Sequence, residues 1–340
     1  MTRIYKHRLF WPLVALAALL LACTIKRPDI LGITVLDGHL FGAPIDILRN
    51  SAPLLLVSLG MTLVIATRGI DLSVGATVAI AGAVALTFIA SSDHPASVGT
   101  ALGAIIVALG LCFILGCFNG MLVANFGIQP IIATLILMTA GRGVAMLITN
   151  GQITTVASAP FSTLASGFLL GLPVAAIIAY GVYLVVALLV RRTALGMLLE
   201  AVGINPEASR LAGVKSKTLV FTVYALCALL SGLAGLIFAA NTMAADANNA
   251  GLFIELDAIL AVVIGGTSLA GGKFNLSGTL VGVLIITTLS LTVTVLGISP
   301  LVTSLFKAIV VIAVTLMMST RLRTMLAGLR ERRRFQEVSA

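Results

Sequence analysis

The sequence predicts an all-α polytopic membrane protein with about ten transmembrane helices in a single membrane domain. The chain of 340 residues is 59% hydrophobic, and only 10% of its residues are charged. Soluble domains carry about 25% charged residues. The apolar residues also form long runs, and a helix needs roughly 20 of them to cross a bilayer. Nearly the whole chain is therefore membrane domain, and no separate enzyme domain is expected.

Ten apolar runs are candidates for membrane spans. They lie near Leu9 to Ile25, Ala52 to Thr67, Leu72 to Ala90, Thr100 to Ala124, Pro130 to Thr149, Phe168 to Val190, Thr218 to Ala240, Leu256 to Ala270, Leu276 to Leu296 and Leu301 to Met318. This assignment divides the chain into a cytoplasmic N-terminus (1–8), a transmembrane domain (9–318) with a long cytoplasmic loop (191–217), and a basic cytoplasmic tail (319–340).

The positions of the positive charges predict the orientation. The net charge is +9, and with a cytoplasmic N-terminus 16 of the 21 Lys and Arg residues fall in cytoplasmic segments. The positive-inside rule then predicts that both termini are cytoplasmic, N-in and C-in. The basic residues indicate contact with anionic lipid of the bilayer and not with nucleic acid.

The first span has an alternative interpretation, because a basic start and the letters LLAC ending at Cys23 resemble a cleaved lipoprotein signal. We favour an uncleaved helix, since nine further spans follow. The other cysteines and the three histidines have no ligand spacing, and TSLAGGKF (267–274) lacks residues that a phosphate-binding loop needs. The sequence predicts no catalytic or metal site.

The longest cytoplasmic loop encodes a short capped helix. Asn205 is a good N-cap, Pro206 suits the first helical position and Glu207 favours the positive helix end. Gly213 can end the helix in a left-handed conformation. Such a helix is either a stiff connector or an element that docks on a cytoplasmic partner.

The stretch TRGIDLSVG interrupts the apolar sequence from Thr67 onward. Asp71 or Ser73 can cap the helix that follows, leaving its backbone amides free to face a ligand. Non-helical backbone at membrane depth is tolerated only against protein or a water-filled path. The stretch is therefore either a broken helix beside a pathway or a cytoplasmic turn.

An outside loop rich in Asp and Asn leads into the eighth predicted span. Glu255 and Asp257 lie in the first turn of that span, where they either cap the helix or hydrogen-bond a hydroxyl-rich solute. Arg142 lies within the fifth span, and a cation there must face water or a partner. We expect it either in a functional cavity or in a salt bridge, with Glu255 or Asp257 as its partner.

These segments resemble the permease subunits of bacterial ABC sugar importers of the ribose and galactofuranose type, the galactofuranose type most of all. The resemblance runs from about Asp37 to Ala313. It is carried by DGHLFGAPIDILRNSAP from Asp37, GMTLVIATRGIDLSVGA from Gly60, ATLILMTAGRGVAMLITNGQ from Ala133, ALGMLLEAVGINPEASRLAGV from Ala194 and ELDAILAVVIGGTSLAGGKFN from Glu255. Arg68 departs from the pattern, because the family usually has a glycine there.

The resemblance implies a non-catalytic permease in the bacterial inner membrane. Its implied partners are a second permease copy or paralogue, a cytoplasmic ABC ATPase and a periplasmic sugar-binding protein. No cofactor belongs to this chain, since ATP and Mg would sit on the ATPase. The cytoplasmic loop becomes the coupling element, with Glu200, Gly203, Asn205, Pro206, Glu207, Arg210 and Gly213 as its candidate residues.

Eight polar residues are candidates for the translocation pathway: Asp71, Ser73, Arg142, Asn150, Gln152, Asn248, Glu255 and Asp257. We expect a weak, shallow sugar site around five of them (Asp71, Ser73, Asn150, Gln152 and Asn248), because only 6% of the residues are aromatic. A gradient-driven secondary sugar transporter is the alternative function, but of the ionisable residues only two cations, Arg142 and Lys307, lie clearly within spans. An inert assembly subunit would not explain the capped loop helix.

Overall fold

The computed structural model describes residues 9–36, 38–299, 302, 305–309 and 312. The α-helices of this part of the chain are α1 (Phe10–Lys26), α2 (Ala43–Ala66), α3 (Val74–Ala90), α4 (Val98–Ala124), α5 (Pro130–Ile148), α6 (Ala159–Ser166), α7 (Val174–Arg192), α8 (Leu195–Ile204), α9 (Pro206–Leu211), α10 (Ser216–Thr242), α11 (Ile254–Ile264) and α12 (Leu276–Val295). A 3-10 helix, η1 (Pro28–Leu31), follows α1.

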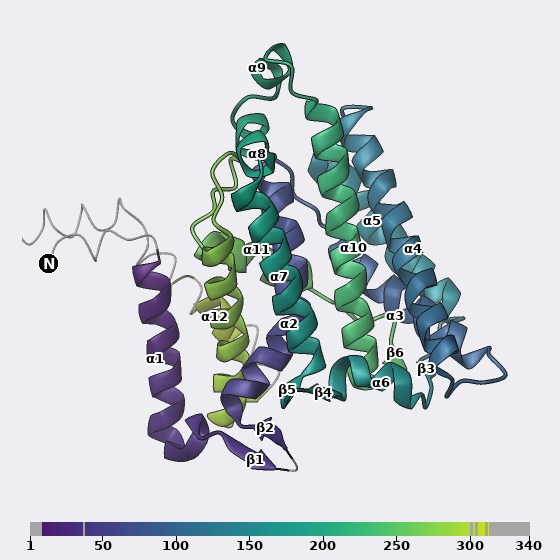
Figure 1. The fold of residues 1–340 in the computed structure, drawn as a ribbon, viewed down its shortest axis with the longest axis vertical. Helices are drawn as coiled ribbons and strands as arrows, with labels where there is room; N and C mark the ends of the chain where they lie inside the picture. The colour runs from purple at the N-terminus through teal and green to yellow at the C-terminus, as the bar shows by residue number, and fades with distance from the viewer. Residues whose placement is uncertain (1–8, 37, 300–301, 303–304, 310–311, 313–340) are drawn as a thin grey trace, which may run out of the picture.

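Short antiparallel strand pairs gather at one end of the helical bundle (Figure 1). They are β1 (Thr34–Leu36) with β2 (His39–Phe41), β4 (Phe168–Leu169) with β5 (Leu172–Pro173), and β3 (Thr154–Thr155) with β6 (Ala244–Ala245). Helices α8 and α9 protrude at the opposite end. We refer to these as the strand end and the α9 end.

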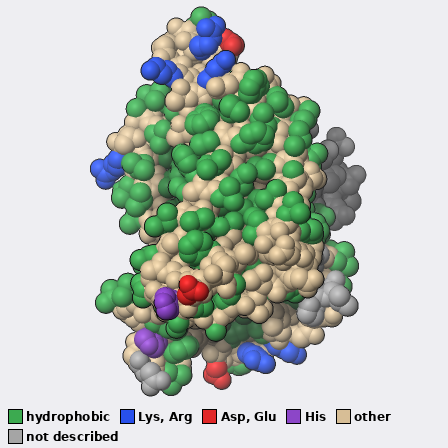
Figure 2. Space-filling view, turned by 90° about the vertical axis from the view of Figure 1, so that its right-hand side faces the viewer, with side chains coloured by type: hydrophobic (Ala, Val, Ile, Leu, Met, Phe, Trp, Pro, Cys, Tyr) green, Lys and Arg blue, Asp and Glu red, His purple; other side chains and the backbone are tan. Residues whose placement is uncertain are grey.

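The bundle has the apolar middle zone of a multi-pass membrane protein. In the described part of the chain, α2, α4, α5, α7, α10 and α12 are long and apolar enough to cross a membrane. Hydrophobic side chains cover much of the middle of the face shown in Figure 2, while Lys and Arg side chains gather toward the α9 end. An apolar zone between two charged ends fits a protein embedded in lipid.

Several predicted spans have different boundaries in the structure. Helices α1 and α3 have 17 residues each. The predicted span from Leu256 to Ala270 was too long, because α11 ends at Ile264 and Gly266 turns left-handed at φ 86°. The last predicted span, Leu301 to Met318, lies largely outside the described residues. The count of ten helices and the N-in, C-in orientation stay predictions.

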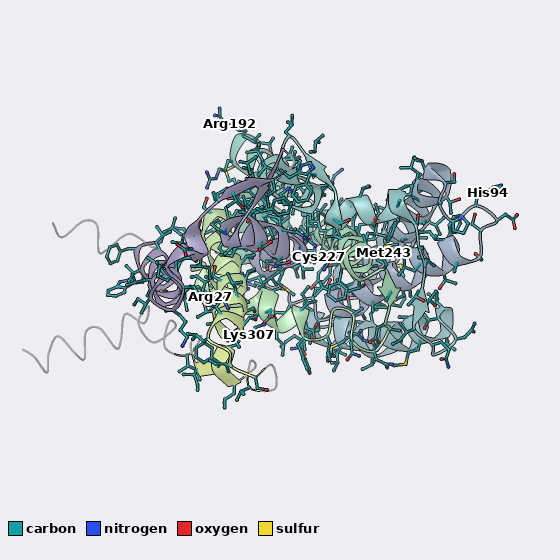
Figure 3. All side chains as sticks on the ribbon, turned by 90° about the horizontal axis from the view of Figure 1, so that it is seen from below. Arg27, His94, Arg192, Cys227, Met243 and Lys307 are labelled. Carbon is teal, nitrogen blue, oxygen red and sulfur yellow. The ribbon has the colours of Figure 1, made fainter. Side chains whose placement is uncertain are left out.

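Helix α10 forms the centre of the bundle and packs against α2, α3 and α4. In the most apolar 18-residue stretches of α2 and α10, 78% of the residues are buried. Seen from the strand end, Cys227 of α10 projects near the middle of the molecule, whereas His94 and Arg192 project at its margin (Figure 3). Glycines permit this packing: a Cβ on Gly116 of α4 would lie 2.8 Å from the Cα of Ala225. Small residues thus bring the helix backbones together, as is common in membranes.

A pair of glycine substitutions on α4 tests this packing. Gly116→Ala places a methyl group against α10, whereas Gly110→Ala meets nothing within 4 Å. Both changes raise helix propensity equally, so the difference between them isolates the helix contact. We expect Gly116→Ala to be less stable by about 1 to 3 kcal/mol, measured as thermal unfolding of the purified protein in detergent. Equal melting temperatures would contradict the close α4–α10 contact.

Candidate functional site

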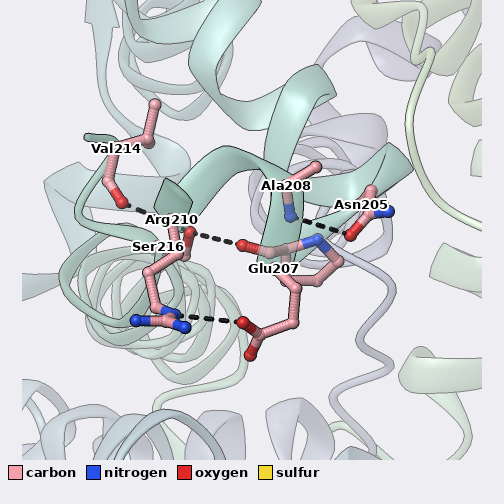
Figure 4. A network of polar contacts seen from close by, with 7 residues as sticks. Asn205, Glu207, Ala208, Arg210, Val214 and Ser216 are labelled. Atoms are coloured by element: carbon pink, nitrogen blue, oxygen red, sulfur yellow. Dashed lines mark hydrogen bonds and ion pairs between the residues drawn. The ribbon is translucent and has the colours of Figure 1, made fainter. Parts of the chain in front are cut away.

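The protruding α8–α9 segment is held by short-range contacts. The Asn205 side chain accepts a hydrogen bond from the Ala208 amide at 3.0 Å, and Glu207 pairs with Arg210 at 3.0 Å (Figure 4). The Ser216 hydroxyl donates to the carbonyl of Pro206 at 3.1 Å. Gly213 has φ 87°. The predicted helix with its N-cap and left-handed end is present.

The loop of residues 191–217 contains two helices, α8 and α9, whereas the sequence predicts one. Residues 195–204 form α8 because their apolar side bears Leu199 and Val202, which are both buried. Glu200 is half-buried and, with Arg191, lines a groove of about 320 Å³ at the base of α8. The groove and the exposed side of α9 together form a platform at this end of the bundle.

Gly203 and Arg68 join the platform to the interior. Gly203 is buried, and a Cβ there would contact the carbonyl oxygen of Ala66 and the backbone of Gly272. The Gly272 amide donates to the same carbonyl of Ala66 at 2.9 Å. The Arg68 guanidinium donates to the carbonyl of Ile204, the last residue of α8. Three segments, the ends of α2 and α8 and the α11–α12 loop, therefore meet in one junction.

Arg68 adopts a backbone conformation that suits glycine. Its φ is 66°, in the left-handed region that a branched or long side chain seldom occupies. This is the position at which the sequence departs from the expected glycine. The side chain of Arg68 also donates a hydrogen bond to the carbonyl of Ile204.

The interruption after α2 starts at the surface with Arg68 and ends inside the bundle. Asp71 and Ser73 are each only 1% exposed. The amide and hydroxyl of Ser73 donate to Asp71 Oδ1 at 2.9 and 2.6 Å, and the Asn119 amide donates to the Ser73 hydroxyl at 2.9 Å. Helix α3 therefore begins among protein side chains, not in an exposed turn. Sequence reasoning missed Asn119, whose only signal is an amide near the end of an apolar span.

The segment between α10 and α11, residues 243–253, folds back into the bundle, and we call it the returning segment. Strand β6 pairs with β3 at the strand end, and the chain then reaches the start of α3. A Cβ on Gly75 would lie 2.7 Å from the Gly251 carbonyl and would contact the Glu255 carboxylate. Glu255 is 5% exposed. The first turns of α3 and α11 thus meet at the buried Glu255 carboxylate.

Arg142 holds the returning segment in place. Its Nη1 atom donates to the carbonyls of Ala247 at 2.9 Å and Ala250 at 2.6 Å. The predicted salt bridges of Arg142 with Glu255 and with Asp257 do not form in the described structure. Asp257 pairs with Lys307 at 2.9 Å instead, and the Arg142 guanidinium binds backbone carbonyls. Backbone carbonyls left free by the break need donors, and the guanidinium supplies them.

The Asp and Asn residues of the returning segment largely bond one another. Asp246 Oδ1 accepts from the amides of Asn248 and Asn249, and its Oδ2 accepts from the Asn249 side chain at 2.7 Å. These hydrogen bonds, that of the Asn249 side chain first, hold the pKa of Asp246 below its ordinary value. The side chain of Asn248 is exposed. Much of the polarity of this segment therefore stabilises a local turn.

The single shallow site expected from the sequence is not formed. Thr134, near the start of α5, donates to the carbonyl of Ile70, which places the α2–α3 interruption at that level. Asn150 and Gln152 follow the other end of α5 and are exposed. Fourteen helical steps of α5 separate Thr134 from Ile148, a rise of about 21 Å, and Asn150 lies beyond this helix end. Asp71 and Ser73 therefore cannot share one sugar-sized site with Asn150 and Gln152.

A groove of about 500 Å³ opens in the strand-end half of the bundle, between α2, α10, α11 and α12. Of the eight pathway candidates only Asp257 lines it. The other polar residues of the groove are not among the residues predicted from the sequence to line a pathway, where Lys307 appears only as a cation within a span. They are Asn50, Thr287, Ser290, Thr294 and Lys307. The spacing of Thr287, Ser290 and Thr294 is that of one helix face and was a usable signal.

Residues 43–315 match the protein family described as "Branched-chain amino acid transport system / permease component". The chain belongs to this family. It is 49% identical to the galactofuranose transporter permease protein YtfT of Escherichia coli K12, over 96% of each chain. It is 42% identical to the fructose import permease protein FruF of Bifidobacterium longum, over 97% of this chain and 93% of the relative. The ribose import permease protein RbsC of E. coli K12 is 39% identical over 80% and 84% of the two chains. No solved structure matches significantly.

Two substitutions at Arg68 separate strain from bonding. Arg68→Gly and Arg68→Ala both remove the hydrogen bond to Ile204, but only alanine keeps the left-handed strain. We expect the glycine variant to be more stable than the alanine variant by about 1 kcal/mol, measured by thermal unfolding. An alanine variant as stable as the glycine variant would be inconsistent with the left-handed backbone.

Substitution of Arg142 tests its hold on the returning segment. Arg142→Gln is expected to lower the yield of folded protein, because the carbonyls of Ala247 and Ala250 lose their donor. Size-exclusion chromatography of the expressed protein measures the folded fraction. The exposed Arg192→Gln is the control and should leave the yield unchanged. A normal yield for Arg142→Gln would contradict the role of this side chain as a structural clamp.

Proposed function

We propose that this chain is the transmembrane subunit of an ATP-driven ABC importer in the bacterial inner membrane, and that it forms the path for a monosaccharide. Family membership supports a permease, and relatives named for galactofuranose, fructose and ribose support a sugar as cargo. The observation that carries the proposal is the α8–α9 platform joined to the bundle interior. A passive channel or an assembly subunit has no need of such a platform.

The platform has the properties of a docking surface for a cytoplasmic ABC ATPase. Met197, Ile204 and Leu211 are 69%, 58% and 80% exposed, beside the exposed ion pair of Glu207 with Arg210. Exposed apolar side chains rimmed by charge are typical of protein interaction sites. In this proposal the α9 end is cytoplasmic and the partner ATPase binds ATP and Mg, while this chain carries no cofactor and performs no catalysis.

The strand end would then face the periplasm and receive sugar from a binding protein. A second copy of the permease, or a paralogue, would complete the path, and no nucleic acid takes part. ATP binding would move the docked platform, and the junction at Arg68 and Gly203 would pass this movement to the interrupted helices. Alternation between outward and inward openings follows from such linkage.

The alternative of a gradient-driven sugar transporter gains one supporting observation. Asp71 and Glu255 are buried carboxylates inside the bundle, whereas the sequence suggested only cations there. Such groups are used for ion coupling in transporters. Uptake into vesicles separates the two functions: the importer requires the ATPase and ATP, while the alternative stops when the ion gradient is dissipated.

Two variants of Gly213 test the coupling role of the platform. No side chain lies within 4 Å of a Cβ at this position, so a substitution acts through the backbone alone. Gly213→Val disfavours the left-handed helix end, whereas Gly213→Asn tolerates it. In the reconstituted complex we expect the valine variant to lose sugar uptake about tenfold relative to ATP hydrolysis, a cost of about 1.4 kcal/mol. The asparagine variant should stay near the unsubstituted level, and equal coupling in both variants would argue against the platform's role.

A further inference from the structure

The groove in the strand-end half of the bundle is built from polar residues that come from distant parts of the chain. Asn50 lies on α2, Thr287, Ser290 and Thr294 lie on α12, and the walls are completed by apolar residues of α2, α10, α11 and α12. Its volume of about 500 Å³ lies in the usual range of small-molecule sites, roughly 300 to 1,000 Å³. The groove is therefore large enough for a monosaccharide.

The lining of the groove combines seven apolar residues with four uncharged polar residues and one ion pair, and it has no net charge. Asp257 and Lys307 form an ion pair at 2.9 Å, and their side chains are 27% and 24% exposed. All other residues that line the groove are uncharged. Asn50 and Thr287 can donate to and accept from sugar hydroxyls. The Ser290 and Thr294 hydroxyls donate to the carbonyls of Ile286 and Ser290 at 3.2 Å and can accept from a sugar. A solute with a net charge would meet no unpaired counter-charge here.

Lipid does not suit this face of the bundle. Helices α2 and α12 are long and apolar enough to span a membrane, and the partly exposed Asp257–Lys307 pair beside them would lose its hydration in hydrocarbon. The faces of α4 and α5 differ, because their exposed residues are large and apolar, as at Ile106 and Ile136. The groove thus faces water or another protein surface.

We propose that this groove is the sugar-contacting wall of the translocation path, and that the Asp257–Lys307 pair restricts the path to uncharged solutes. This inference rests on the proposed function, since that function supplies the sugar. The uncharged amide and hydroxyl oxygens in the lining can hydrogen-bond a neutral polyhydroxylated cargo. The path runs along α12 on the side of Thr287, Ser290 and Thr294, and not past Asn150 and Gln152.

Cysteine modification in the full transporter complex tests the location. Ser290→Cys lies in the groove, Ser166→Cys lies exposed on α6 outside it, and Ile106→Cys lies on the apolar face of α4. A water-soluble thiol reagent should modify Cys at 290 and at 166 but not at 106. The unsubstituted complex gives the background of the native cysteines, which are buried except for the half-buried Cys117. Lack of reaction at 290, with reaction at 166, would overturn the proposal.

Protection by sugar tests the assignment of the cargo. The sugar used is whichever of galactofuranose, fructose and ribose the unsubstituted complex takes up, at millimolar concentration. The sugar should slow the modification of Cys at 290 but not of Cys at 166. Modification at 290 should in turn block sugar uptake. No protection at 290 in a complex that transports would overturn the inference. Absence of ATP-dependent uptake in the unsubstituted complex would instead refute the proposed function, and the reactivity at 290 can still be measured.

The charge of the groove is tested with single and double neutral variants. Asp257→Asn leaves Lys307 unpaired, and Lys307→Gln leaves Asp257 unpaired. The rate ratio of an anionic to a cationic thiol reagent at Ser290→Cys should rise about fivefold in the first variant and fall about fivefold in the second, as a unit charge nearby would produce. The double variant Asp257→Asn with Lys307→Gln should restore the original ratio. Ratios that do not respond to these changes would show that the pair does not line the path.

Discussion

Hydrocarbon offers no hydrogen bonds to a peptide group, and this constraint determines how the chain interrupts its helices. The starts of α3 and α11 lie inside the bundle, where each freed backbone group needs a protein partner. Asp71 accepts from the backbone and side chain of Ser73 at the first break. Arg142 donates to two carbonyls at the second. Because these partners come from the protein, the breaks place polar groups at membrane depth without contact to lipid.

The protruding platform is joined to the rest of the bundle at one junction. The first break joins α8 directly through Arg68, and the loop after α11 joins the same junction through Gly272. The exposed ion pair on α9 contributes little stability by itself. The rigidity of the platform therefore comes from its base, where Gly203 allows backbone segments to touch. The base of α8 therefore contacts both the end of α2 and the loop that follows α11.

Neutralised charge is common to the polar interior of this protein. Lys307 is paired with Asp257, Glu255 lies at two helix starts, and Arg142 is satisfied by carbonyl oxygens. Buried charges that are paired or hydrogen-bonded avoid the large desolvation cost of isolated ones. Paired or hydrogen-bonded charges and uncharged hydroxyls therefore occur together in the described interior, a combination consistent with the neutral sugars named for its relatives.

The sequence by itself determined the features that depend on neighbouring residues. The N-cap at Asn205 and the left-handed end at Gly213 follow from local backbone preferences, and most spans follow from runs of apolar residues. The hydroxyl stripe on α12 was also readable, because its spacing is that of a helix face, but sequence spacing does not reveal what a face contacts. Only the tertiary structure decided that Asp257 pairs with Lys307, 50 residues away, that Arg142 binds carbonyls, and that Arg68 reaches Ile204. In a chain that is apolar almost everywhere, hydropathy identifies helices but does not specify which of them are neighbours, since that choice depends on glycine contacts and on a few polar partners brought together by folding.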